Sequence, residues 1–488
     1  MRRFVLPMLI LALALMAACG AAETPSEPAA PAATEAPAAA EPTEAPAEEP
    51  AAAEPTEAPA EEPAAEATEA PAEEPAAEEA MPAVDINCGT DEEVTITFIG
   101  DPAGTHPDAE AATIERFQAA CPNITVDRIP GDANVQNLLA VYLTAFEAES
   151  PDFDVIRVDV IWPGLLAEHL LDMSEFTAQE QIDSYLPSLV LNDTVDGRLV
   201  ALPLRIGFGM LYYRTDLLEK YGFDAPPATW DELESMAQTI QDGERADGNA
   251  EFWGFVWQGN AYEGLTTNAL EWQVSNGGGS IVSPEGEIEV NNEATIAAFE
   301  RAAGWVDTIS PPGVVSYAEE DARGVWHAGN AAFMRNWPYA YSSSLESEAI
   351  GGNFDVAPVP AGDAGVGAAT LGGWHIGVSR YSENPEAAAA FAAYMTSVEN
   401  QKHYAIDTSS PPASLALYAD PDIQAAMPFA SPEVVEVTTA RPSTATAEKY
   451  NEVSTLYFTA VHSILTGEQD AATAVELLEL DLMDLLGN

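Results

Sequence analysis

The sequence predicts an α/β fold with two lobes and a ligand cleft between them. Strand-like and helix-like segments alternate from Val94 onward, which is the pattern of a parallel sheet with crossover helices. Later segments leave this arrangement, build a second set of strands and helices, and return to the first. About 400 residues follow a low-complexity N-terminal region, enough for two lobes with separate cores. We therefore expect the lobes to be joined by a hinge of more than one strand.

The first 18 residues are typical of a signal peptide. Met1-Arg2-Arg3 is a positive start, and Phe4–Ala18 is an apolar run too short to span a membrane as a helix. The stretch Leu15-Met16-Ala17-Ala18-Cys19-Gly20 resembles a bacterial lipobox, although lipoboxes favour Leu where this chain has Met16. The resemblance implies cleavage before Cys19 and lipidation of that residue; the alternative is an ordinary secretory signal with a chance cysteine. We expect an extracytoplasmic protein, anchored by lipid to the bacterial cell membrane without crossing it.

Residues 19–84 contain the lipidated cysteine and then a segment of Ala, Pro, Glu and Thr. A ten-residue unit in this segment begins at Thr43, Thr56 and Thr68. Such a composition buries too little apolar surface to offset the entropy of folding. Repeated proline and like-charge repulsion keep the chain extended. We predict a disordered spacer that holds the globular body away from the membrane.

The charge of the chain excludes several classes of partner. The sequence has 80 Asp and Glu against 17 Lys and Arg, a net charge of −63, and lysine occurs only at positions 220, 402 and 449. Nucleic acids require a basic face, so we expect no nucleic-acid partner. The same balance argues against phosphorylated or strongly anionic ligands. No motif for a metal or a cofactor is present, and we expect neither.

Cys88 and Cys121 are positioned to meet in the predicted fold. Cys88 lies just before the first strand, and Cys121 lies between the first helix and the second strand. These points come together at one end of a βαβ unit, and an extracytoplasmic compartment permits oxidation. We favour a disulfide over two free thiols.

The predicted elements follow in chain order. In the first lobe we expect strands at 94–99, 124–129 and 153–158, and helices at 108–120 and 134–147. Residues 195–203 are expected to form a turn that leads into a strand, and further strands are expected at 208–214, 253–259, 331–337, 354–358 and 371–378. Further helices are expected at 216–221, 229–240, 262–274, 295–309, 385–396 and over most of 448–486. We assign 85–190 and 376–428 to the N-terminal lobe, and 191–375 and 429–488 to the C-terminal lobe.

Two stretches predict ligand-binding positions at strand ends. Asp159 follows the third strand and so lies at the carboxyl edge of the sheet, where α/β proteins bind ligands. The apolar run that ends at Met334 reads as a buried strand that Pro338 terminates. If the backbone stays extended beyond it, Trp337 and Tyr339 share one face. Flat aromatic faces suit the C–H face of a sugar ring, although ordinary core packing would give the same pattern.

Several stretches in a fixed order carry a family resemblance. They are Asp159-Val-Ile-Trp-Pro-Gly164, Leu211-Tyr-Tyr-Arg-Thr-Asp-Leu217, Phe255-Val-Trp-Gln-Gly259, Tyr262-Glu-Gly-Leu265, Arg335-Asn-Trp-Pro-Tyr339, Gly372-Gly-Trp-His-Ile-Gly377 and Ala440-Arg-Pro442. With them the body resembles the extracellular solute-binding proteins of family 1, the carbohydrate-binding components of ABC importers, and within that family the trehalose/maltose-binding subgroup. The resemblance implies a periplasmic-binding-protein-like fold of type II and a monomer without enzymatic activity. It also implies capture of a neutral sugar by hinge closure and delivery to the permease transmembrane subunits.

The resemblance implies ligand-binding roles for seven residues. Asp159 matches a sugar-binding carboxylate of the N-terminal lobe, and Glu263 matches one of the other lobe. Stacking faces are implied for Trp337, Tyr339 and Trp374. A backbone contact is implied for Gly373, and a pair of hydrogen-bond donors for Arg441. Three of these residues have a plainer interpretation: a helix cap for Asp159, a solvated helix face for Glu263 and a surface ion pair for Arg441.

The sequence departs from the subgroup in the pocket region, and other functions stay open. Arg205 stands near the position where the subgroup carries an acidic residue, and Asp101 and His106 occupy a loop where it tends to have Glu. A secreted glycosidase using Asp159 and Glu263 is one alternative. The others are a structural surface lipoprotein and a binder of another polyol or oligosaccharide.

Overall fold

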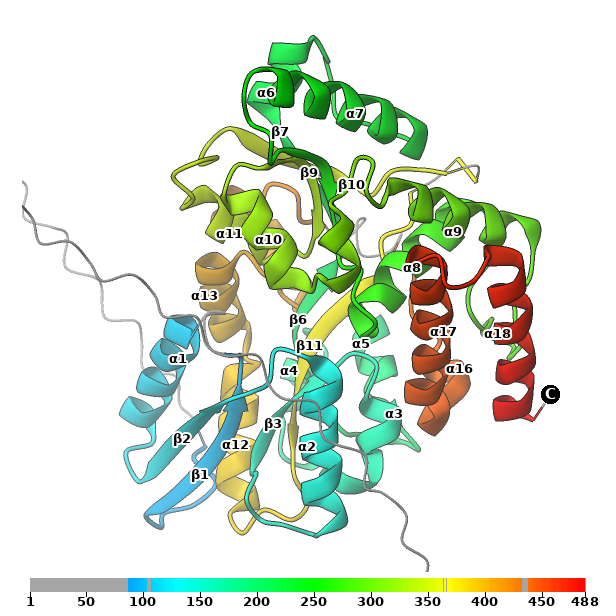
Figure 1. Cartoon of the computed structure of the whole chain (residues 1–488). Helices are drawn as coiled ribbons and strands as arrows, with labels where there is room; N and C mark the ends of the chain where they lie inside the picture. The colour runs from blue at the N-terminus through cyan, green and yellow to red at the C-terminus, as the bar shows by residue number, and fades with distance from the viewer. Residues whose placement is uncertain (1–86, 103–106, 363, 366, 432–437, 488) are drawn as a thin grey trace, which may run out of the picture. The chain divides into compact units, whose positions relative to one another are not determined.

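The computed structural model describes residues 87–102, 107–362, 364–365, 367–431 and 438–487, all within the unit formed by residues 80–488. The predictions about the signal peptide, Cys19, the spacer and His106 concern residues outside this part of the chain. The described residues form two main sheets, and we call the regions built on them the N-terminal and C-terminal lobes (Figure 1). Across the described ranges, no helix combines the length and apolar character needed to span a membrane.

The N-terminal lobe is built on a five-stranded sheet in the order β2-β1-β3-β11-β6. Its strands are β1 (Val94–Gly100), β2 (Ile124–Pro130), β3 (Val155–Asp159), β6 (Leu202–Phe208) and β11 (Leu371–Val378). β1 is parallel to β2 and β3, as the strand–helix alternation predicts, whereas β11 is antiparallel to its neighbours β3 and β6. A small hairpin of β4 (Thr194–Val195) and β5 (Arg198–Leu199) precedes β6.

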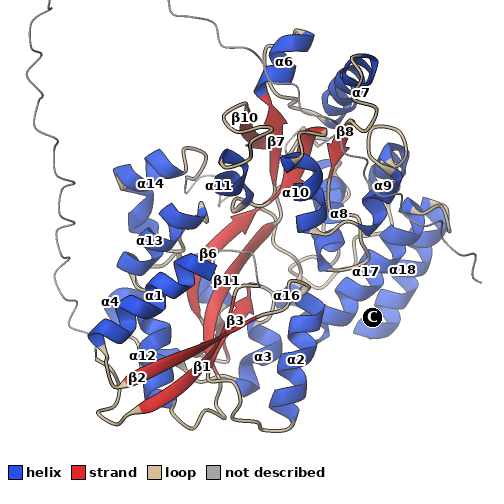
Figure 2. Cartoon of the chain, turned by 60° about the vertical axis from the view of Figure 1, so that its left-hand side comes forward, coloured by secondary structure: helices blue, strands red, loops and turns tan. Residues whose placement is uncertain are grey.

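Helices cover both faces of this sheet. They are α1 (Pro107–Ala120), α2 (Val135–Glu147), α3 (Pro163–Leu166), α4 (Gln179–Ile182), α5 (Pro187–Asn192), α12 (Pro385–Met395), α13 (Val398–Thr408) and α14 (Pro421–Ala426). Figure 2 shows α1 and α12 on one side and α2 and α3 on the other. Phe117 and Phe391 pack together on the first side, and Tyr142 and Phe146 lie in the core of the second. Because both faces are covered, all five residues of β3 are buried.

The predicted disulfide is present in the N-terminal lobe. Cys88 and Cys121 are bonded, with their Cα atoms 5.7 Å apart. Cys121 is completely buried in the core formed by β1, β2, α1 and α12. The bond therefore ties the start of the folded body to the turn between α1 and β2.

The C-terminal lobe is built on a four-stranded sheet in the order β10-β7-β9-β8. Its strands are β7 (Met210–Arg214), β8 (Trp253–Val256), β9 (Ala331–Asn336) and β10 (Phe354–Pro358). Its helices are α6 (Thr215–Tyr221), α7 (Trp230–Ala246), α8 (Glu263–Ser275), α9 (Glu293–Trp305), α10 (Glu319–His327), α11 (Ala340–Leu345), α17 (Tyr450–Leu465) and α18 (Ala471–Leu486), with α16 (Ser443–Thr446) leading into α17. The larger core joins the sheet to α7, α8, α9, α17 and α18, and a smaller one joins it to α10 (Figure 1).

Three crossing segments join the lobes: residues 208–210, 369–371 and 438–441. They lie side by side, because Gly209 N–H donates to Thr370 O (3.3 Å) and Leu371 N–H donates to Thr439 O (2.9 Å). This arrangement is the expected multi-strand hinge. The predicted boundaries at residues 190 and 376 need correction, because β6 and the start of β11 hydrogen-bond within the N-terminal sheet. The chain enters the C-terminal lobe only after Phe208.

Candidate functional site

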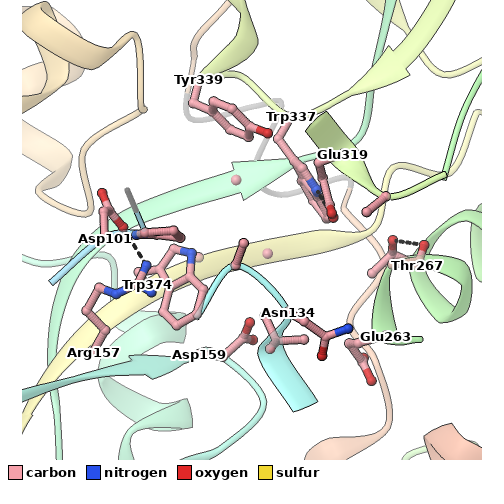
Figure 3. Close-up of a pocket in the computed structure, with 18 of the residues that line it drawn as sticks. Asp101, Asn134, Arg157, Asp159, Glu263, Thr267, Glu319, Trp337, Tyr339 and Trp374 are labelled. Atoms are coloured by element: carbon pink, nitrogen blue, oxygen red, sulfur yellow. Dashed lines mark hydrogen bonds and ion pairs between the residues drawn. The ribbon is translucent and has the colours of Figure 1, made fainter. Parts of the chain in front are cut away.

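A cavity of about 450 Å³ is lined by residues of both lobes (Figure 3). Every residue that the sequence suggested for ligand binding lines it: Asp159, Glu263, Trp337, Tyr339, Gly373, Trp374 and Arg441. Asp101 and Arg205, noted as departures from the subgroup, line it as well. Residues from segments far apart in the chain thus form one pocket, and their roles toward a ligand stay predictions.

Asp159, Gly373 and Trp374 form the wall on the N-terminal lobe. Asp159 ends β3 and lies opposite Trp374 in β11. Gly373 has φ +155°, and a Cβ atom there would lie 2.8 Å from the carbonyl oxygen of Arg205, so glycine alone fits. The Gly373 carbonyl accepts the N–H of Val160 (3.1 Å) and is therefore already used within the protein.

A buried arginine supports the Trp374 ring. The Arg157 guanidinium carbon lies 4.1 Å from the ring centroid, a cation–π contact. Arg157 also pairs with Asp101, and Arg205 pairs with the same Asp101 oxygen (2.7 Å). Arg205 therefore brings no unpaired positive charge into the pocket. Sequence reasoning missed Arg157, although a charged residue inside an apolar strand was a signal that it must be paired.

Trp337 and Tyr339 form the wall on the C-terminal lobe. β9 ends at Asn336, whose side-chain oxygen accepts the Trp337 N–H (2.8 Å). Tyr339 has φ −59° and ψ −23° and is the N-cap residue directly before α11, so the backbone is not extended there. The expectation that the two rings share one face of an extended strand is therefore wrong. Both rings nevertheless line the pocket and lie near each other in Figure 3.

Two carboxylates at the start of α10 orient these aromatic side chains. Glu319 accepts the Trp337 indole N–H (3.3 Å) and the Tyr262 hydroxyl (2.5 Å). Glu320 accepts the Tyr339 hydroxyl (2.8 Å). Both glutamates line the pocket, and sequence reasoning missed them. Their only signal was the acidic first turn of α10, which is common at helix N-termini for electrostatic reasons alone.

Arg441 bridges carboxylates of the two lobes. Its Nη1 donates to Glu263 Oε1 (2.8 Å) and its Nη2 to Asp159 Oδ1 (3.3 Å). Glu263 also accepts hydroxyl hydrogen bonds from Tyr450 and Ser454 of α17, each at 2.5 Å. Glu263 and Arg441 are thus bonded chiefly to the protein. Within the described residues no group donates to Asp159 Oδ2, which leaves that oxygen for a ligand hydroxyl.

The electrostatics of this cluster bear on the glycosidase alternative. Burial raises the pKa of Glu263, while Arg441, Ser454 and Tyr450 act in the opposite direction. A hydrolase needs its two carboxyl groups on either side of the scissile bond. Here a single guanidinium is hydrogen-bonded to Asp159 and Glu263 at once, which argues against that geometry. The described residues contain no group of three potential metal ligands.

Comparisons with known proteins agree on one family. A family model described as bacterial extracellular solute-binding protein matches residues 103–402. The chain is 44% identical over 398 residues, 81% of this chain and 94% of the relative, to a probable ABC transporter-binding protein of Deinococcus radiodurans. The solved structure of maltose-bound MalE3 of T. maritima is 37% identical, with a TM-score of 0.76 over 80% of this chain and 99% of its own. A Thermotoga lettingae solute-binding protein bound with α-D-tagatose, 22% identical with a TM-score of 0.72 over 80% of this chain and all of its own, shares the fold. The fold is that of type II periplasmic binding proteins.

Proposed function

The chain belongs to the bacterial extracellular solute-binding protein family, and we propose that it captures a neutral sugar for an ABC importer. One observation carries the proposal: an indole face from each lobe, Trp337 and Trp374, lines one cavity together with the Asp159 carboxylate. Indole faces stack on the C–H face of a pyranose, and a carboxylate oxygen accepts hydrogen bonds from sugar hydroxyls. Hinge closure would bring both lobes onto the same ligand.

The charges in the pocket support a neutral ligand. Each of its four arginines has a carboxylate partner: Arg157 and Arg205 pair with Asp101, Arg323 with Glu320, and Arg441 with Asp159 and Glu263. An anionic ligand would have to compete with these carboxylates. The cavity of about 450 Å³ is in the range of small-molecule sites and supports a disaccharide such as trehalose or maltose. The maltose bound to the T. maritima protein, which is 37% identical to this chain, points the same way.

Family membership indicates where the protein works, and the predicted lipobox suggests how it is held there. The family is extracytoplasmic. We propose that Cys19 carries the lipid anchor and that the Ala/Pro/Glu segment lets the monomeric body reach the permease subunits. A tether of this kind raises the effective concentration of the bound protein at the membrane.

A tryptophan-fluorescence titration of the mature chain tests the proposal. Trehalose, maltose, sucrose, a maltodextrin and a polyol are added in turn, with Trp337→Ala as the test variant. Trp253→Ala is the matched control, because Trp253 starts β8 and does not line the pocket. We expect saturable binding of one sugar, weakened at least about tenfold by Trp337→Ala and unchanged by the control, since stacking contributes roughly 1–2 kcal/mol or more.

The same samples separate the alternatives. No saturable change in tryptophan fluorescence with any of the added compounds, in protein shown to be folded, would contradict the proposal and favour a structural lipoprotein. Release of monosaccharide during the titration would favour the glycosidase.

A further inference from the structure

A buried ion pair lies in the C-terminal lobe between the crossing segments and the pocket. Glu271 of α8 and Arg335 of β9 bind each other through two contacts, Nη2 to Oε1 at 2.5 Å and Nε to Oε2 at 3.0 Å. The two residues are 0% and 2% exposed. Burying both charges costs several kcal/mol, and stability alone is a weak reason to keep such a pair. The further contacts of each partner indicate what the pair does.

Glu271 contacts the crossing segments. Its Oε1 accepts the backbone N–H of Thr370 (3.0 Å), and the carbonyl of Thr370 in turn accepts the N–H of Gly209. A Cβ atom at Gly209 would lie 1.9 Å from Glu271 Oε1 and 2.7 Å from Arg335 Nη2. Two of the three crossing segments therefore pack directly on the ion pair, and position 209 has room only for glycine.

Arg335 packs on the Trp337 ring. Its guanidinium carbon lies 4.2 Å from the centroid of the Trp337 ring. Its remaining nitrogen, Nη1, donates to Gln258 Oε1 (3.1 Å), and Gln258 Nε2 donates back to the Arg335 carbonyl (2.9 Å). All three guanidinium nitrogens are thus bound to protein groups. The plane of the guanidinium is fixed from three directions, and the indole stacks on that plane.

We propose that Glu271 and Arg335 are positioning residues that couple the crossing segments to the orientation of the Trp337 ring. When the lobes move, Thr370 and Gly209 shift the carboxylate that they contact. The displaced carboxylate moves the guanidinium to which it is hydrogen-bonded, and the guanidinium in turn moves the indole ring that packs on it. This coupling rests on the proposed function, because Trp337 acquires its role as a stacking face there. It makes the hinge conformation a determinant of sugar affinity.

Trp374 provides an internal reference. It also stacks on an arginine, Arg157, but the carboxylate partner Asp101 is bonded by Arg205 and Tyr404 of the same lobe. A disturbance at Gly209 should therefore reach Trp337 and leave Trp374 unchanged. A general loss of folding would affect both rings.

The test is ¹⁹F NMR of the mature chain labelled with 5-fluorotryptophan, with the signals assigned through Trp337→Phe and Trp374→Phe. Gly209→Ala is the test variant, and Gly304→Ala is the matched control, because a Cβ at Gly304 meets no atom within 4 Å. We expect Gly209→Ala to shift or broaden the Trp337 signal, with Trp374 unchanged. The control should leave both signals as in the wild type. This readout needs no sugar, so it tests the coupling even if no ligand is found.

Two further variants keep the test decisive if Gly209→Ala does not fold. Arg335→Lys keeps the charge but loses the planar face, and we expect it to move the Trp337 signal alone; Arg157→Lys should move the Trp374 signal alone. If the wild-type protein binds a sugar, the Gly209→Ala and Arg335→Lys variants should each bind that sugar roughly tenfold more weakly. A change of this size is a typical coupling between sites. A Trp337 signal that is the same in Gly209→Ala and Gly304→Ala, or equal changes in both tryptophans, would overturn the proposal.

Discussion

Arg441 holds a carboxylate of each lobe with one guanidinium. It is 6% exposed, and it reaches Glu263 with one nitrogen and Asp159 with another. Both carboxylates are buried as well. Burial of an unpaired carboxylate is costly, and the positive charge between the two offsets this desolvation cost. The guanidinium thus links a carboxylate of one lobe to a carboxylate of the other.

Replacement of Arg441 should cost far more stability than replacement of an exposed arginine. Arg441→Met leaves two buried carboxylates facing each other, and we expect the free energy of unfolding to fall by about 3–5 kcal/mol. The matched control is Arg301→Met, which removes surface pairs with Asp231 and Glu234 and should cost less than about 1 kcal/mol. Urea unfolding followed by circular dichroism measures both values. Equal losses in the two variants would show that the bridge contributes nothing specific.

The sequence led to the residues at strand ends but not to the charges behind them. Asp159 and Trp337 follow apolar runs, and that position alone predicts the ligand edge of a sheet. Arg157 lies inside one such run and Arg335 directly follows the other within the predicted strand, so the sequence indicates that each needs a partner. It does not indicate which partner, because Asp101 and Glu271 lie 56 and 64 residues away along the chain. Long-range pairing of this kind is decided by tertiary packing.

At the scale of elements, the disulfide secures the first βαβ unit. The bond closes a loop with a sequence separation of 33 residues between Cys88 and Cys121. Closing a loop of this length reduces the entropy of the unfolded chain by an amount worth about 3–4 kcal/mol. Because the bond lies in the N-terminal core and away from the pocket, its contribution belongs to folding and not to sugar binding.

Removal of this bond should lower the melting temperature without changing the affinity for sugar. The variant Cys88→Ala/Cys121→Ala is compared with wild-type protein by calorimetry, with and without a reducing agent. We expect the variant to melt several degrees lower, and the reducing agent to lower the wild type toward the variant while leaving the variant itself unchanged. A variant as stable as the wild type would contradict the prediction.

Regular elements could be predicted from the sequence, and turns between lobes could not. The first three strands and the helices α1 and α2 lie within a few residues of the expected ranges, because their apolar periodicity is strong. The lobe boundary at 190 was wrong because β6 returns to the N-terminal sheet before the chain crosses. Tyr339 was misassigned for a similar reason: Pro338 ends the strand, but the local sequence does not determine that a helix follows at once.

At the scale of the whole molecule, basic residues are few, and several of them are buried near the pocket. Against 80 acidic residues the chain has 17 Lys and Arg. Four of these, Arg157, Arg205, Arg335 and Arg441, are buried in or beside the pocket. The exterior therefore carries little positive charge to offset its carboxylates, and repulsion among them opposes the compact state.

Salt should stabilise this protein and leave its sugar affinity nearly unchanged. Raising NaCl from 0.01 M to 1 M shortens the Debye length from about 30 Å to about 3 Å, which screens exposed carboxylates from one another. We expect the melting temperature to rise by roughly 5 °C, a change of about 4 kcal/mol for a folded body of about 400 residues. Most of the rise should occur below about 0.3 M, because screening saturates there, whereas exclusion of ions from the protein surface grows steadily with concentration.

The buried ion pairs of the pocket are screened far less, and a neutral ligand adds no charge, so the dissociation constant from calorimetry should change by less than about twofold. A melting temperature independent of salt would show that surface repulsion is already balanced, and an affinity that falls steeply with salt would show that the ligand is charged.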